Sequence, residues 1–211
     1  MNNKGSRRGY GESKQLLAEE VFHHIATQII DGDLAPGHRI RDVDVAEELH
    51  VSRTPVREAL QRLERLGLVT MYPSRFTEVT EVTPEIVEQT LEFAGYQAGA
   101  AARMAVMRMT DAQRAHAATL VEGMYDALDD SVAISNSRWA VFSYLSDHSQ
   151  NAQHRVLVQD AGIALFRNLR SWTIPHDDRE RMTQLYRDFR EAVLRGDGDD
   201  AERLTRAMHY V

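Results

Sequence analysis

A chain of 211 residues with 43% hydrophobic and 27% charged residues has the length and composition of one or two globular domains, which excludes a wholly disordered protein. It contains no cysteine, so disulfides and thiolate metal sites are excluded, and it has no apolar run of membrane-spanning length. The polar residues 1–10 lack the hydrophobic segment of a secretory signal, so we expect a cytoplasmic protein without membrane contact.

The net charge of −7 argues at first against a nucleic-acid partner, because phosphate binding requires local positive potential. The negative charge is unevenly distributed, however. Residues 1–80 hold 11 Lys+Arg against 12 Asp+Glu, whereas residues 81–211 hold 14 against 20. A near-neutral first part can still bind DNA if its arginines share one face, so the charge does not exclude that function.

Three helices are predicted in the first part of the chain. Apolar residues recur at helical spacing from Leu16 to Ile30, and Gly32 and Pro36-Gly37 follow, which predicts an amphipathic helix that ends there. Residues 43–49 predict a second, shorter helix. After Ser52, which has the character of an N-cap, an apolar stripe at helical spacing predicts a third helix that ends at Gly67.

Beyond the third helix, residues 68–72 and 77–82 are rich in β-prone side chains and flank Pro73-Ser74, which predicts a small hairpin or wing. From Pro84 onward the pattern is helical, with breaks expected near residues 111, 129–137, 173–178 and 196–200. The fold class is therefore mainly α. We expect a flexible tail at residues 1–12, a winged helix-turn-helix at 13–82 and an all-helical bundle at 83–211.

The second and third helices, joined by a tight turn, would present the N-terminus of the third helix to a DNA major groove. Arg53 and Arg57 lie one turn apart on the face opposite the leucine stripe and can donate forked hydrogen bonds to guanine or phosphate. The hydroxyls of Ser52 and Thr54 can help to hold a phosphate at the positive end of the helix dipole. The alternative is that the arginines form an ordinary solvated face.

The segment Val-Ser-Arg-Thr-Pro-Val-Arg-Glu-Ala-Leu at residues 51–60 closely resembles the recognition-helix signature of the GntR family of bacterial regulators. The similarity extends over residues 31–69, and the helical second part resembles the ligand-sensing (FCD-like) domain of the FadR-type branch. The resemblance implies that the wing tip reaches the minor groove through an Arg-Gly pair. Here Ser74 and Arg75 are the candidate contacts, and Phe76 stands in place of the glycine.

In many sensor domains of that branch, a divalent metal is held by an Asp and a His four residues apart on one helix and by two later histidines. The resemblance implies that Gln150, His154, Tyr186 and His209 occupy these positions. An amide and a phenol are poor metal ligands, so a divalent metal on His154 and His209 is the less favoured reading. The four residues would instead bind an organic ligand, or the histidines would be ordinary surface or core residues.

The sequence thus predicts a DNA-binding transcription regulator, a repressor by expectation, whose binding to a near-palindromic operator is modulated by a small effector in the helical domain. The resemblance implies an organic acid as effector. We expect a homodimer, because two recognition helices on a symmetric site multiply the affinity. The alternatives are a constitutive DNA-binding protein that has lost effector sensing and a metal-dependent enzyme built on His154 and His209. The sequence shows no convincing nucleophile, general base or phosphate loop for such an enzyme, so no enzymatic activity is expected.

Overall fold

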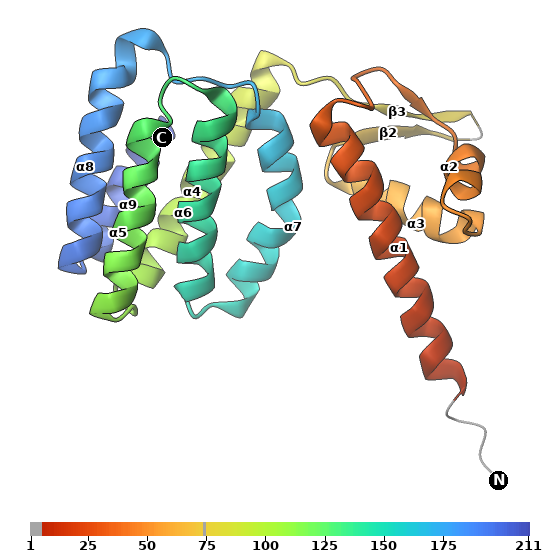
Figure 1. Ribbon diagram of the computed structural model, residues 1–211, viewed down its shortest axis with the longest axis horizontal. Coiled ribbons are helices and arrows are strands. Elements are labelled where there is room, and N and C mark those ends of the chain that lie inside the picture. The colour runs from red at the N-terminus through yellow and green to blue at the C-terminus, as the bar shows by residue number, and fades with distance from the viewer. Residues whose placement is uncertain (1–5, 74) are drawn as a thin grey trace. The chain divides into compact units, whose positions relative to one another are not determined.

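The computed structural model describes residues 6–73 and 75–211, with side chains described from residue 16 onward. This part of the chain is mainly helical and divides into two compact units, Met1–Val82 and Thr83–Val211 (Figure 1). No described helix is both long and apolar enough to cross a membrane. We describe each unit by itself.

The first unit combines three helices with a small sheet. Its elements are α1 (Ser6–Asp31), β1 (Arg39–Ile40), α2 (Asp42–Glu48), α3 (Arg53–Arg65), β2 (Val69–Tyr72) and β3 (Phe76–Val79). The sheet is antiparallel with the order β1-β3-β2, so β3 pairs with both neighbours. Helix α1 begins inside the segment 1–12 that was expected to be a flexible tail, and β1 was not predicted, because two residues are too short to show an alternating pattern.

The core of the first unit lies between α1 and α3. Phe22 and Ile25 of α1 and Val56, Leu60 and Leu63 of α3 are each at most 1% exposed. They are the apolar positions that recur at helical spacing in the sequence, so burying one stripe of each helix packs the two together. This packing turns the opposite face of α3 outward.

The turn between α2 and α3 and both ends of α3 follow from local backbone chemistry. His50 adopts a left-handed conformation (φ 53°) in the turn. Ser52 is the N-cap residue of α3, but its side chain makes no capping hydrogen bond and is exposed. Gly67, with φ 72°, ends the segment as glycine commonly does after a helix.

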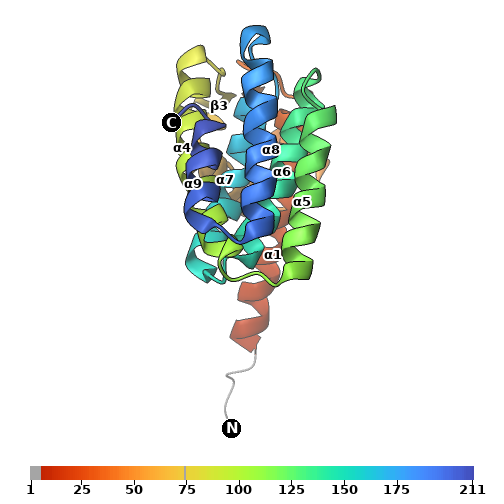
Figure 2. The same ribbon diagram turned by 90° about the vertical axis from the view of Figure 1, so that its left-hand side faces the viewer.

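The second unit consists of helices joined by short connections, as predicted. They are α4 (Pro84–Val106), α5 (Asp111–Asp126), α6 (Ser131–His148), α7 (Ala152–Leu169), the 3-10 turn η1 (His176–Asp178), α8 (Arg179–Arg195) and α9 (Gly198–Ala207). Helix α8 lies between α5 and α9, and α4 packs against α6, α7 and α9 (Figure 2). Tyr186 and Phe189 of α8 are fully buried in the core between these helices.

One helix boundary in this unit was not predicted. Residues 149–151 separate α6 from α7, and Gln150 there has a left-handed backbone with φ 53°. The side chain of Asn151 then caps α7 by accepting a hydrogen bond from the backbone N–H of His154. Gln150 and His154 therefore do not lie on one face of a continuous helix.

Candidate functional site

The exposed face of α3 carries the arginine pair that the sequence predicts. Arg53 and Arg57 both contact one carboxylate, that of Asp42 in the first turn of α2. Arg53 Nη2 lies 3.0 and 2.9 Å from the two Asp42 oxygens, and Arg57 Nε lies 2.7 Å from Oδ2. Both arginine side chains remain more than half exposed, so one carboxylate aligns two guanidinium groups that still face solvent.

The ionisation of Asp42 supports this arrangement. Partial burial alone would raise the pKa of Asp42, but hydrogen bonds from Arg57 and Arg53, together with their positive charges, outweigh it and lower the pKa. The carboxylate is therefore charged at neutral pH. It holds both guanidinium groups in charge-assisted hydrogen bonds.

The other predicted DNA contacts lie in the same unit. Ser52, Thr54 and Arg75 are exposed, and Arg75 lies in the turn between β2 and β3. Ser74 lies outside the described residues. Phe76 is part of an aromatic cluster: its ring centroid is 4.8 Å from that of Tyr72 and 4.1 Å from the Cζ atom of Arg39.

If the arginines contact bases as predicted, we expect Asp42→Asn to reduce the ratio of operator affinity to random-DNA affinity by about tenfold, because the two side chains lose the anion that aligns them. The affinity for random DNA should stay the same or increase, because the variant has one negative charge fewer to repel the DNA phosphates. Competition binding with both DNAs measures the ratio. Asp44→Asn is the matched control, because Asp44 lies on the same helix and pairs with Arg41 instead. An unchanged ratio in Asp42→Asn would show that the bridge does not align the arginines.

A cavity of about 80 Å³ lies within the second unit. It is lined from α4, α6 and α7, by Trp172 after α7, and by His209 near the end of the chain. Most of its surface comes from aliphatic and aromatic side chains, including those of Trp139, Phe142 and Phe166. Both tryptophans of the sequence contribute to the lining.

Arg138 of α6 is the functional candidate that sequence reasoning missed. It lines the cavity and is only 7% exposed. Its Nη1 lies 3.4 Å from the Tyr186 hydroxyl oxygen and its Nη2 lies 3.3 Å from the Met208 carbonyl oxygen. Its Cζ atom lies 5.4 Å from the ring centroid of Trp172. Among the described side chains that line the cavity, it is the only one that carries a full charge at neutral pH.

Two of the four predicted ligand-binding residues lie next to Arg138. His209 lines the cavity itself, and Tyr186 reaches Arg138 through its hydroxyl. Burial lowers the pKa of His209 well below its usual range, and the positive charge of Arg138 adds to this effect. The ring is neutral, with Nδ1 2.7 Å from the Thr205 carbonyl oxygen.

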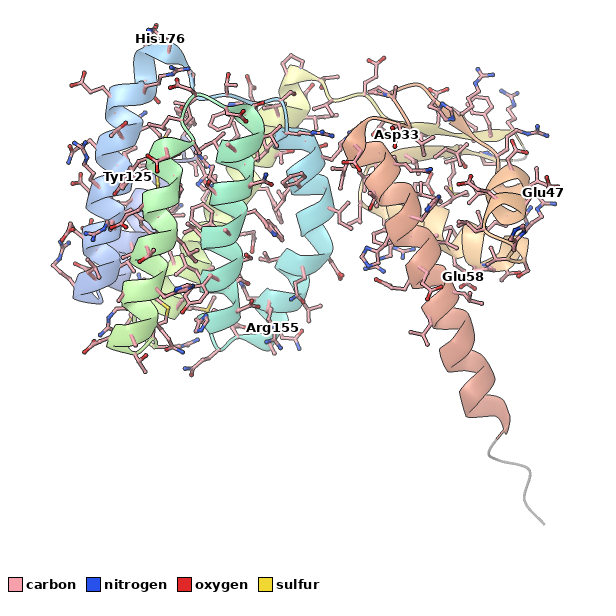
Figure 3. All side chains as sticks on the ribbon, viewed as in Figure 1. Asp33, Glu47, Glu58, Tyr125, Arg155 and His176 are labelled. Carbon is pink, nitrogen blue, oxygen red and sulfur yellow. The ribbon has the colours of Figure 1, made fainter. Side chains whose placement is uncertain are left out.

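The other two predicted residues lie elsewhere, which corrects the expected cluster. Gln150 is in the turn between α6 and α7, and His154 contacts the carbonyl oxygen of Gln97 at 3.1 Å and Ser146 at 3.4 Å. Neither lines the cavity. The next residue, Arg155, lies close to the junction of α6 and α7 (Figure 3). The α6 residues that do line the cavity are Ser135, Arg138, Trp139, Phe142 and Ser143.

This arrangement does not fit a divalent metal. The guanidinium of Arg138 lies beside Tyr186 and His209 and repels a second cation. Among the side chains of residues 16–73 and 75–211, no group of three His, Asp or Glu is arranged to hold a metal ion. The donor set around Arg138 is instead suited to an anion.

Comparisons with known proteins agree with the two-unit fold. Residues 17–79 match the model of the "Bacterial regulatory proteins, gntR family", and residues 98–209 match the FCD domain. A helix-turn-helix regulator from the TAR-I ttuE-ttuC′ intergenic region of Agrobacterium vitis is 33% identical over 87 residues, which are 41% of this chain and 51% of that protein. The regulator Mce2R of Mycobacterium tuberculosis is 40% identical over 70 residues, 33% of this chain and 29% of that protein.

The chain thus spans about half or less of the length of these curated relatives. The structure of McbR/YncC from E. coli has the same fold, with a TM-score of 0.68 and 22% identity over 92% of this chain and 93% of that one. The relatives are named as transcriptional regulators and not as enzymes, as the sequence led us to expect. Because the FCD match covers more than half of the chain and the gntR match covers most of the first unit, the chain belongs to the GntR family of bacterial regulatory proteins, with an FCD domain as its second unit.

Proposed function

We propose that this protein binds a near-palindromic DNA operator as a homodimer and represses transcription until a small organic acid binds in the cavity of its FCD domain. The DNA-binding part of the proposal rests on Arg53 and Arg57, the exposed arginine pair in the N-terminal part of α3. The Asp42 carboxylate of α2 aligns both side chains. The leucine stripe of α3 is buried against α1, so the polar face of α3 is presented to a partner.

In the proposed complex, each exposed side chain has a chemical role. Arg53 and Arg57 donate forked hydrogen bonds to base edges or phosphates in the major groove. Ser52 and Thr54, beside the free N–H groups of the first turn of α3, hold a phosphate. Arg75 contacts the backbone or the minor groove from the wing, with Ser74 proposed from the sequence alone.

The homodimer and the repression follow from how such a unit would work. One α3 helix reads few base pairs, so two copies on a symmetric site are needed for tight and specific binding. A ligand that binds one arrangement of the two FCD domains more tightly shifts the protein toward that arrangement. If the DNA-bound arrangement is the other one, the ligand releases the operator.

The test is fluorescence anisotropy of the purified protein on DNA from upstream of its own gene, over a salt series, beside random DNA. We expect specific binding that weakens with salt, and a loss of about 10- to 100-fold in Arg53→Ala. Arg187→Ala is the control, because it removes the same charge from an exposed position in the other unit. Equal binding by wild type and Arg53→Ala, or failure to select any operator from whole-genome fragments, would reject the proposal.

A further inference from the structure

We propose that the ligand of the FCD cavity is a small, largely apolar monocarboxylate that the guanidinium of Arg138 binds directly, without a metal ion. This inference rests on the proposed function for the regulatory role of the ligand. The binding itself is argued from the cavity alone.

The first argument is the unpaired positive charge of Arg138. Its side chain is more than nine-tenths buried, yet no described carboxylate lies within ion-pair distance of it. Asp178, in the 3-10 turn η1, pairs with Arg181 at 3.2 Å. A buried charge without a counter-ion is costly, and a bound carboxylate would supply the missing partner.

The second argument is the hydrogen-bonding capacity that Arg138 retains. Its two hydrogen bonds, to Tyr186 and to the Met208 carbonyl, are long at 3.4 and 3.3 Å and go to neutral acceptors. A planar guanidinium has enough N–H donors to hold these groups and a carboxylate together, in the forked geometry that carboxylates prefer. Arg138 is therefore suited to anchor an acid group.

The third argument is the apolar character of the remaining cavity wall, which indicates that the rest of the ligand is apolar too. Trp139, Phe142, Val158 and Phe166 present carbon to the cavity. The hydroxyls of Ser135 and Ser143 are already bound to main-chain carbonyls, at 3.2 and 2.6 Å. A second carboxylate would be buried there without a cation, so dicarboxylates are disfavoured.

The size of the cavity limits the ligand as well. Its volume of about 80 Å³ is smaller than that of an engineered apolar cavity of about 150 Å³ that binds benzene. A short aliphatic acid fits this space, and an aromatic acid requires some movement of the lining side chains. We therefore expect acids with small tails to bind best.

The experiment measures ligand binding by tryptophan fluorescence and by thermal stabilisation of the full chain, without DNA. The probes are butanoate, hexanoate and benzoate, each beside its amide and beside succinate, in the presence of a chelator. We expect at least one monocarboxylate to bind at least about tenfold more tightly than its amide, because only the acid provides a charge for Arg138. Added zinc should not improve binding.

Variants at Arg138 complete the test. Arg138→Gln should weaken binding of the acid at least about tenfold while leaving the weak binding of the amide unchanged, and Arg138→Lys should retain part of the affinity. Arg187→Gln is the control on an exposed surface. Equal binding of acid and amide to the wild type, dependence on a metal, or no binding by any of the acids at millimolar concentration would each overturn the inference.

The wild-type comparison of acid with amide keeps the test valid even if Arg138→Gln does not fold. The outcome is also separable from that of the DNA test. Acid binding without any operator binding would leave the cavity assignment intact and reject the regulatory function. Operator binding without acid binding would reject the cavity assignment but keep the DNA-binding function, and would favour a constitutive DNA-binding protein.

Discussion

Leu63→Ala is expected to destabilise the DNA-binding unit by about 3–5 kcal/mol, lowering its melting temperature by about 10 °C or more. Leu63 is fully buried where α3 packs against α1, so the truncation leaves a cavity in the core of a small unit. A loss of this size is a large fraction of the stability of such a unit, so operator binding should fall with it.

The measurement is thermal unfolding followed in parallel by circular dichroism and by tryptophan emission. Trp139 and Trp172, the only tryptophans of the sequence, lie in the FCD domain, so emission reports on that domain alone. We expect the dichroism transition of the first unit to shift and the emission transition to stay in place. Gln61→Ala, an exposed change on the same helix, is the control. A shift of the emission transition by the same amount would show that the two units unfold as one.

Phe189→Ala is expected to produce the opposite pattern, with a loss of about 3–5 kcal/mol in the FCD domain. Phe189 is fully buried on α8, and its ring centroid lies 6.3 Å from that of Phe142, which lines the cavity. Removing the ring therefore takes away support from the cavity wall as well as core packing. We expect the affinity for the carboxylate probes to fall, and the midpoint temperature of the emission transition to fall as well.

Arg187→Ala is the matched control for Phe189→Ala, because it lies on the same helix and its side chain is exposed. Phe189→Ala leaves the DNA-binding unit intact. Operator binding is therefore expected to fall only if the destabilised FCD domain no longer supports dimer formation. Unchanged probe binding in a destabilised Phe189→Ala protein would mean that Phe142 keeps its position without this support.

The sequence predicted most of the first unit because the determining interactions there are local. The apolar stripe from Val56 to Leu63 and the glycine at residue 67 define α3 within one short segment, although the Ser52 side chain makes no capping hydrogen bond. The strand β1 could not be predicted in the same way, since its two residues form a strand only by pairing with Thr77 and Glu78, far along the chain. The bridge from Asp42 to the arginines also joins two helices and requires the tertiary structure.

The cavity was predicted less well because helix spacing was applied across a helix boundary. The pairing of Gln150 with His154 assumed a continuous helix, but the chain turns at Gln150 and Asn151 starts a new one. A signal for Arg138 was present, since it is the only charged residue between Ser131 and Ser146. Whether such a lone charge faces solvent or a cavity depends on how α6 packs, which the sequence pattern does not contain.

The bridge at Asp42 also bears on how quickly the protein would find its operator. A regulator searching a chromosome spends most of its time on random sequence, held there mainly by attraction to phosphates. The Asp42 carboxylate, within about 3 Å of the arginine nitrogens, offsets part of that attraction wherever no specific base contact compensates. Under the proposed function, each stay at a wrong site would therefore be shortened, and the protein would sample more of the genome in a given time.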